Sequence, residues 1–262
     1  MRPSVLEQLR AGTPVFGVGI RNARTTEIVR MARTAGFGVA WVDLEHSSMS
    51  IDCAAQIAAS ACDLGLEGWV RTPERDLGAI GRLLDGGASG IIAPRVETAD
   101  DARAVVSAAR FPPRGSRSRI GLLPQSGYRR LAAAELMQSA DEVTTVNVLL
   151  ESRDGVRNAD SIAAVDGVDL LHVGMNDLST DLGHTGEPTH PEVMSACLSV
   201  ITAARRRGKA AVVGGLHDLT VLREMVRAGA APLLLAAIDT DILASGLAQR
   251  VLEWRASWQP SL

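Results

Sequence analysis

Acidic side chains follow several apolar runs of this sequence, and two of them have the chemistry of metal ligands. Glu151 directly follows the run 145–150, and Asp177 lies just beyond the run 170–174. Mg²⁺ and Mn²⁺ prefer oxygen ligands, and Mg²⁺ often takes only one or two protein carboxylates. A 2-oxo acid can chelate such an ion, which then stabilises the enolate formed on deprotonation. The alternative is that either carboxylate caps a helix or pairs with an arginine.

His46 is the best candidate for a general base. It is the only histidine that directly follows a predicted strand and lies beside carboxylates. Asp43 can fix the tautomer of His46 and raise its basicity, but in an extended strand the two side chains lie on opposite faces. The pair therefore requires the chain to turn after Glu45. The alternative is a structural role, as we expect for His172 inside an apolar run.

Arg71, near the end of the run 68–72, is a candidate cation for binding substrate oxygens. It can hold a keto oxygen or a carboxylate, and the alternative is a salt bridge to Glu45 or Glu67. The only lysine, Lys209, ends a predicted helix. No lysine is thus placed for a Schiff base, which favours metal stabilisation of an enolate over class I aldolase chemistry. Nucleotide-binding glycine motifs are absent.

Short apolar runs that alternate with helical patterns must position these side chains. The predicted strands are 15–20, 38–45, 68–72, 90–96, 145–150, 170–174, 210–213 and 233–238. Eight β-α units without a composition shift predict an α/β fold, a (β/α)8 TIM barrel in which residues 1–262 form a single domain. A doubly wound open sheet is the alternative, because periodicity does not show closure. In a barrel the active site lies at the carboxyl ends of the strands, where the candidate residues stand.

One connection breaks the rhythm of this pattern. Residues 111–143 form a long loop with several prolines and glycines and a predicted helix near 132–137. Long loops in compact domains are often functional, so we expect this one to cover or neighbour the barrel mouth. The alternative is an interface or an insertion without function.

Composition excludes several classes of protein. Aromatic residues make up 3% of the 262 residues, so the core must consist of Ala, Val, Leu and Ile. The formal net charge is −3 with both signs interspersed, which does not favour a nucleic-acid partner. We expect no membrane span and no signal peptide, and the three cysteines, Cys53, Cys62 and Cys197, to be reduced thiols of a cytoplasmic protein.

Eight motifs occur in an order and spacing that resemble the HpcH/HpaI aldolase family, the class II pyruvate aldolases. They are Asp43-Leu44-Glu45-His46, Val70-Arg71, Leu84-Asp85-Gly86-Gly87-Ala88, Pro94, Phe111-Pro112-Pro113-Arg114-Gly115-Ser116-Arg117, Glu151, Asp166-Gly167-Val168-Asp169 and Gly174-Met175-Asn176-Asp177-Leu178-Ser179. Each motif is weak by itself, but the set covers about residues 15–247.

The resemblance implies a reaction and a set of site residues. Such enzymes are (β/α)8 barrels that reversibly split 4-hydroxy-2-oxo acids into pyruvate and an aldehyde, with Mg²⁺, Mn²⁺ or another divalent ion such as Co²⁺. The metal ligands would be Glu151 and Asp177. His46 would act with Asp43 in proton transfer, Arg71 would stabilise the pyruvate oxygen, and Asp85 would be a further catalytic residue. The substrate-binding residues would be Arg71, Gly174, Met175, Asn176 and Asp177, with backbone amides holding the carboxylate.

The resemblance also implies a homo-oligomer, a hexamer or trimer of dimers, in which the last helix is exchanged between neighbours. Trp254 and Trp258 lie four residues apart on that helix and suit such packing, although docking onto the chain's own barrel is the alternative. Three departures from the family pattern affect the expected substrate rather than the metal. Met175 replaces a proline, Ser118 replaces a glycine, and Leu149 stands where a polar side chain or Met is frequent.

Related functions fit the same residues. Decarboxylation of an oxaloacetate-like acid and a specialised bond-forming reaction would use the same enolate, and a citrate-lyase-like enzyme would act on a CoA ester. A barrel that binds a small acid without turnover is disfavoured by Glu151, Asp177, His46 and Arg71 together.

Overall fold

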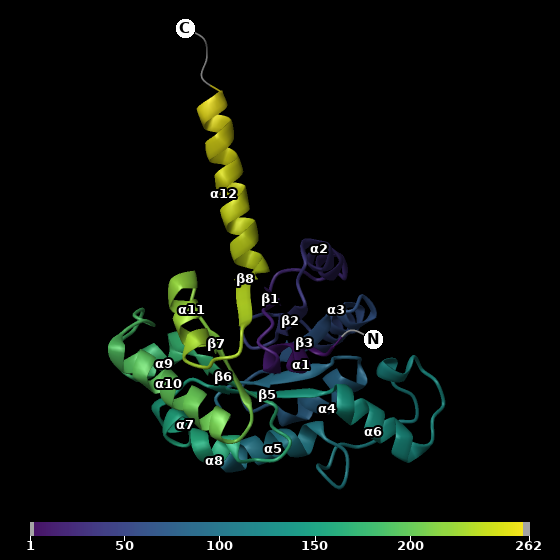
Figure 1. The fold of residues 1–262 in the computed structure, drawn as a ribbon. Coiled ribbons are helices and arrows are strands. Elements are labelled where there is room, and N and C mark those ends of the chain that lie inside the picture. The colour runs from purple at the N-terminus through teal and green to yellow at the C-terminus, as the bar shows by residue number, and fades with distance from the viewer. Residues whose placement is uncertain (1–2, 259–262) are drawn as a thin grey trace.

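Eight parallel strands follow one another round a ring in the computed structural model, which describes residues 3–258 (Figure 1). They are β1 Val15–Ile20, β2 Val39–Asp43, β3 Glu67–Arg71, β4 Gly90–Ala93, β5 Thr145–Leu150, β6 Leu170–Gly174, β7 Ala210–Gly214 and β8 Leu233–Ile238. β1 pairs with both β2 and β8, and β7 approaches β8 through a hydrogen bond from Ala231 N to Ala211 O of 2.7 Å. The predicted (β/α)8 barrel is confirmed.

Helices surround the strands and connect them. They are α1 Val5–Arg10, α2 Glu27–Ala35, α3 Ile51–Asp63, α4 Leu77–Asp85, α5 Ala99–Ala109, α6 Ala133–Val143, α7 Arg153–Arg157, α8 Ala159–Ala163, α9 Met175–Asp181, α10 Pro191–Arg206, α11 Leu219–Arg227 and α12 Asp239–Ser257, with a 3-10 helix, η1, at Pro124–Ser126. Local sequence sets several starts. Thr98 and Asp101, for example, form a capping box at α5.

Two apolar layers hold the barrel together. The larger lies between strands and helices and contains mostly Ala, Val, Leu and Ile. The smaller fills the barrel interior and includes Trp69 and Leu170. At the amino-terminal end of the strands, α1 closes this interior, because Val5 N and Trp69 Nε1 each donate to Glu67 at 2.7 Å. Any active site must therefore open at the carboxyl ends.

The long loop 111–143 does not lie at the barrel mouth, contrary to our expectation. It leaves the end of α5 and returns to the start of β5, so it lies at the amino-terminal ends of the strands, where α6 packs beside η1 (Figure 1). Gln125 Nε2 donates to Leu84 O at 2.6 Å, which attaches the loop to the end of α4. Phe111, Leu123 and Leu136 form a small separate core within it.

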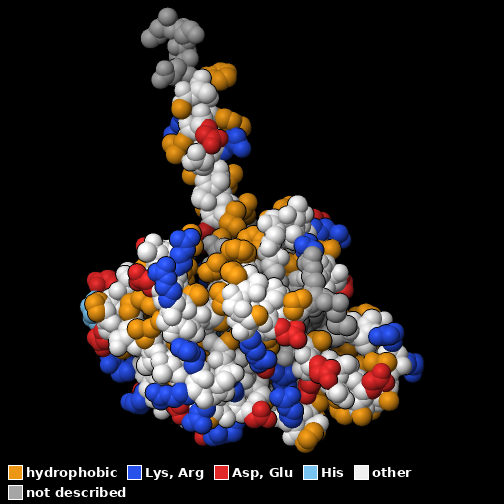
Figure 2. Space-filling view, viewed as in Figure 1, with side chains coloured by type: hydrophobic (Ala, Val, Ile, Leu, Met, Phe, Trp, Pro, Cys, Tyr) orange, Lys and Arg blue, Asp and Glu red, His pale blue; other side chains and the backbone are white. Residues whose placement is uncertain are grey.

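The last helix, α12, projects from the barrel instead of packing on it (Figures 1 and 2). Its apolar side chains are exposed: Ile242, Leu243, Leu247, Val251, Leu252 and Trp254, and so is Trp258 just beyond it. The alternative of docking onto the chain's own barrel does not apply to this structure. Among residues 3–258, no helix is both long and apolar enough to span a membrane.

Gly68 in β3 tests how tightly the helical layer is packed. A Cβ at this position would lie 2.1 Å from Ala58 O in α3, a backbone atom that cannot move aside. We predict that Gly68→Ala destabilises the protein by about 2 kcal/mol or more, measured as the urea midpoint. Gly81→Ala in α4 is the matched control. Its Cβ has open space, so it should be neutral or stabilising. Equal effects of the two changes would contradict this packing.

Candidate active site

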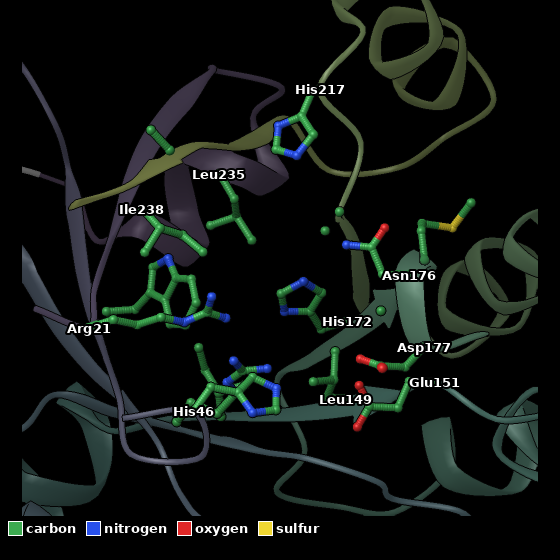
Figure 3. Close-up of a pocket in the computed structure, with 18 of the residues that line it drawn as sticks. Arg21, His46, Leu149, Glu151, His172, Asn176, Asp177, His217, Leu235 and Ile238 are labelled. Carbon is green, nitrogen blue, oxygen red and sulfur yellow. The ribbon is translucent and has the colours of Figure 1, made fainter. Parts of the chain in front are cut away.

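A cavity of about 410 Å³ opens at the carboxyl ends of the strands (Figure 3). Its lining brings together most of the predicted site: His46, Arg71, Glu151, Gly174, Met175, Asn176 and Asp177. These residues come from the ends of β2, β3, β5 and β6 and from the first turn of α9. The rule that places barrel chemistry at strand ends thus identifies the cavity.

Glu151 is a buried carboxylate, only 3% exposed, immediately after β5. Burial raises its pKa to about 7, and the nearby negative charges of Glu45 and Asp177 add to the shift. One opposing contact is the backbone N–H of Arg95, which donates to Glu151 Oε1 at 2.9 Å. Arg95 adopts a φ of 49°, a left-handed conformation that is uncommon for a residue with a side chain. The carboxylates of Glu151, Glu45 and Asp177 raise one another's energy, so a cation bound beside them would be stabilised.

Gly174 leaves the space that the Glu151 carboxylate occupies. A Cβ at this position would lie 2.8 Å from Glu151 Oε2 and 3.0 Å from Glu151 Cβ. Gly174 is also the N-cap of α9, and it makes no side-chain cap there. The first backbone N–H groups of α9 thus begin at the cavity wall beside Glu151 and Asp177, which line the same side of the cavity (Figure 3).

Asp43 and Arg71 form a buried ion pair between neighbouring strands. Their Cα positions are partners in the β2–β3 register. Arg71 donates to Asp43 through Nε at 2.9 Å and Nη2 at 2.6 Å, and its Nη1 lies 2.9 Å from Glu45. Burial by itself would raise the pKa of Asp43, but its arginine partners hold it below the ordinary value. Of the alternatives for Arg71, the salt bridge to Glu45 forms, whereas Glu67 lies at the other end of the barrel.

His46 stands at the cavity rim with its side chain 51% exposed. The chain turns after β2 as an Asp43–His46 pair requires, and Asp43 Oδ1 accepts the backbone N–H of His46 at 3.2 Å. In the described range 3–258, however, the imidazole ring of His46 makes no hydrogen bond to the Asp43 carboxylate; only the backbone N–H of His46 does. The closest carboxylate contact of the ring is Glu45, 3.8 Å from Nε2. Asp43 therefore shapes the loop that carries His46.

Two predicted site residues do not line the cavity. Asp43 lies behind its wall, where it accepts hydrogen bonds from Arg21 and Arg71. Asp85 is remote from the cavity. It is the last residue of α4 and precedes the start of β4, so it lies near the amino-terminal ends of the strands. Its carboxylate pairs with Arg117 Nη2 of the long loop at 2.7 Å. Asp85 cannot reach the cavity of its own chain.

Several cavity residues were not predicted as functional from the sequence, and the polar ones are Arg21, Trp41, His172, His217 and Asp241. Arg21 follows β1, and the same strand-end rule that identified Arg71 applies to it. Trp41 in β2 and His172 in β6 lie within apolar runs and line the cavity as well. Burial lowers the pKa of His172 to about 3, so the ring is neutral near pH 7. We expected His172 to point into packing, and the sequence carried no signal against that.

A second group of possible metal ligands lies outside the cavity, at the start of α10. His184, His190 and Glu192 have ligand atoms within 4.8 Å of one another. These atoms already have partners, because His184 Nε2 lies 3.0 Å from Glu192 and His190 Nδ1 accepts the Glu192 N–H at 3.3 Å. The two rings stack at 3.4 Å. The group is accounted for as a helix cap.

Comparison with known proteins assigns this barrel to a family. The family model described as HpcH/HpaI aldolase/citrate lyase matches residues 21–244. A 4-hydroxy-4-methyl-2-oxoglutarate aldolase of Hapsidospora irregularis is 40% identical over 87% of this chain and 86% of its own. A hydroxypyruvate/pyruvate aldolase of Sagittula stellata is 33% identical over 94% of this chain and 95% of its own. The crystal structure of an HpcH/HpaI aldolase from Desulfitobacterium hafniense superposes with a TM-score of 0.89 at 30% identity, over 99% of both chains.

The fold and the cavity define an enzyme barrel with its chemistry at the strand ends. The chain belongs to the HpcH/HpaI aldolase/citrate lyase family. The predicted resemblance is thereby confirmed, and so is the predicted class, a carbon–carbon lyase of the class II aldolase type, a class that generally depends on a divalent metal ion.

The raised pKa of Glu151 should make the free energy of unfolding of the metal-free protein depend on pH. Its pKa rises from an ordinary 4.5 to about 7 on folding, so the folded state binds more protons between these values. Stability should therefore fall as pH rises from about 4.5 to about 7, by up to about 1.4 kcal/mol per pH unit for one group. We predict that Glu151→Gln removes this part of the slope, in urea titrations with a chelator present. Glu142→Gln, at an exposed position, should leave it, and parallel curves for wild type and Glu151→Gln would contradict the assignment.

Proposed function

We propose that this protein is a divalent-metal-dependent aldolase that reversibly cleaves a 4-hydroxy-2-oxo acid into pyruvate and an aldehyde or ketone. The observation that carries the proposal is the buried Glu151 carboxylate, held beside Asp177 and Glu45 at the carboxyl ends of the strands. Relatives whose names specify aldolase reactions on such acids, at 31% to 40% identity over most of the chain, support it.

The residues at this position fit a divalent cation. Burying neighbouring carboxylates is costly unless positive charge compensates them, and the raised pKa of Glu151 reflects that cost. We assign Glu151 and Asp177 as the ligands, and oxygen ligands suit Mg²⁺, Mn²⁺ or Co²⁺. When bound, such an ion supplies positive charge to the oxygen of the enolate as it forms.

The chain's own residues would handle the proton and the orientation of the substrate. In the cleavage direction His46 accepts the proton of the 4-hydroxyl group, the C3–C4 bond breaks, and its electron pair forms the pyruvate enolate. A proton returned to C3 then completes the methyl group. The backbone N–H groups of Gly174, Met175 and Asn176 hold the pyruvate carboxylate, and Arg71 contributes N–H groups to the keto oxygen.

Asp43 acts in this proposal as a positioning residue. It is fully buried, and it holds both the Arg71 guanidinium and the backbone of the His46 turn. Asp85 has a catalytic role only at the cavity of a neighbouring copy, since it is far from its own. Decarboxylation of an oxaloacetate-like acid would use the same enolate, and the release of CO₂ rather than an aldehyde distinguishes that reaction.

We further propose that α12 packs between copies of this chain. Large apolar side chains are normally buried, and those of α12 are exposed from Ile242 to Trp254. A hexamer or trimer of dimers with exchanged terminal helices would cover it. The three cysteines are free, as expected of a cytoplasmic protein, and that location stays a prediction.

Deuterium exchange into the pyruvate methyl group tests the enolate step alone. With Mn²⁺ the wild type should incorporate deuterium, as followed by NMR, and a chelator should stop it. Asp177→Ala should abolish exchange through loss of a ligand, and His46→Ala should slow it by at least about 100-fold through loss of the base. The exposed Glu142→Ala is the control. Exchange that persists in Asp177→Ala would remove the proposed metal site.

Charges on α12 should disrupt the proposed assembly. In Leu247→Glu/Leu252→Glu the buried interface would contain two unpaired carboxylates, so the oligomer should dissociate, with the mass measured by light scattering after gel filtration. Gln249→Glu adds a charge without removing apolar surface and should weaken assembly less. A monomeric wild type, or a double variant with the wild-type mass, would refute the role of α12.

A further inference from the structure

The cavity wall opposite Glu151 and Asp177 carries a cation with unused hydrogen-bond donors. Arg21 donates through Nε to Asp43 at 2.6 Å, and its side chain is 29% exposed. Within residues 3–258, neither Nη1 nor Nη2 of Arg21 has an acceptor. Figure 3 shows the side chain pointing into the cavity from the side opposite Asp177 and Glu151.

Arg21 is held in this position by its backbone as well. Asp239, which is buried at the start of α12, accepts the N–H groups of three successive residues. The distances are 2.9 Å from Arg21, 3.0 Å from Asn22 and 2.7 Å from Ala23. Because both ends of Arg21 are fixed by carboxylates, its Nη atoms are preorganised to receive an anion.

Two more polar groups of the same cavity lack partners. Trp41 is 8% exposed and His172 is 7% exposed. Trp41 Nε1 and His172 Nδ1 are buried without a hydrogen bond in the described part of the chain, although both residues line the cavity. Buried polar atoms are rarely left unpaired, because each costs about 1–3 kcal/mol. Both atoms are therefore left to pair with a polar group of a ligand in this cavity.

Much of the remaining cavity lining is apolar and includes Ile92, Leu149, Leu235 and Ile238, whereas His217 and Asp241 are polar side chains of the same lining. Arg71 is not an equivalent anchor, because its Nε, Nη1 and Nη2 each already contact Asp43 or Glu45. Arg21 therefore keeps both Nη groups for a ligand. The apolar side chains of this lining lower the local dielectric, which strengthens a hydrogen-bonded ion pair between its guanidinium group and an anion.

We propose that Arg21, with Trp41 Nε1 and His172, binds a carboxylate on the acceptor half of the substrate. The inference rests on the proposed function, which places pyruvate at Glu151 and Asp177. The substrate would then be a 4-hydroxy-2-oxo dicarboxylate, and the acceptor a short aldehyde or ketone that carries a carboxylate. In the synthetic direction C3 of the enolate bonds to the acceptor carbonyl carbon, whose oxygen takes up one proton, while the distal carboxylate pairs with both Nη groups of Arg21.

The test compares a charged with a neutral acceptor. Pyruvate is the donor in the presence of Mn²⁺, and glyoxylate and glycolaldehyde are the acceptors, each measured as kcat/KM. Arg21→Met should lower the glyoxylate-to-glycolaldehyde ratio by about 10- to 100-fold, the scale of a hydrogen bond to a charged group. Arg21→Lys, which keeps the charge but not the paired donors, should give an intermediate ratio. Arg30→Met, at an exposed position on α2, should leave the ratio at its wild-type value.

Deuterium exchange into pyruvate without acceptor separates this inference from the function on which it rests. The loss of glyoxylate turnover in Arg21→Met should exceed any loss of exchange at least tenfold. Exchange absent from the wild type would overturn the proposed function itself. Normal exchange with an unchanged ratio in Arg21→Met would overturn only the acceptor site, as would equal losses of exchange and glyoxylate turnover. Arg21→Gln, which keeps a donor for Asp43, gives the same comparison if Arg21→Met is not recovered folded.

Discussion

A single buried carboxylate, Asp43, holds together the wall of the cavity that carries Arg21, Arg71 and His46. It accepts hydrogen bonds from Arg71 at the end of β3, from Arg21 just after β1, and from the backbone of the turn that carries His46. Two guanidinium groups hold the pKa of Asp43 low despite complete burial. Because one carboxylate positions two guanidinium groups and the turn that carries His46, the geometry of this wall depends on Asp43.

The opposite wall is built on an unfavourable interaction. Glu151 is almost fully buried in the cavity wall beside two other carboxylates, and its pKa, raised to about 7, reflects the free-energy cost of ionising it there. Local backbone features maintain the arrangement. Gly174 leaves room for the carboxylate, and Arg95 takes a left-handed conformation while its N–H donates to Glu151. A site that crowds negative charge in this way is suited to binding a cation.

Much of the fold, and the cavity wall that contains Glu151 and Asp177, could be predicted from the sequence, because both follow from the repeated alternation of strands and helices. Charged residues at the ends of apolar runs identified Glu151, Asp177 and Arg71. Arg21 satisfies the same rule but stands in the β1–α2 loop. The conformation of this loop depends on Asp239, which follows the neighbouring strand β8 and lies more than 200 positions away in the sequence. His172 could not be distinguished from a packed histidine, since only the barrel's closure shows which ring faces the cavity.

Two misplacements have a common topological cause. The long loop 111–143 and Asp85 both follow the end of a helix and precede a strand, and such segments lie at the amino-terminal ends of the strands in a barrel. The expectation of a loop over the mouth weighed its length and neglected this direction. The projection of α12 was not predictable from the pattern of one chain, because a helix that packs on a neighbour has the same composition as one that packs on its own barrel.

The most direct test of this account is a crystal structure with Mn²⁺ and pyruvate, with the ion identified by anomalous diffraction. We predict an anomalous peak within about 2.2 Å of carboxylate oxygens of both Glu151 and Asp177. Pyruvate oxygens should complete the coordination, and the methyl carbon should face Arg21. A peak at His184, His190 and Glu192 alone, or none in the cavity at saturating Mn²⁺, would contradict the central claim.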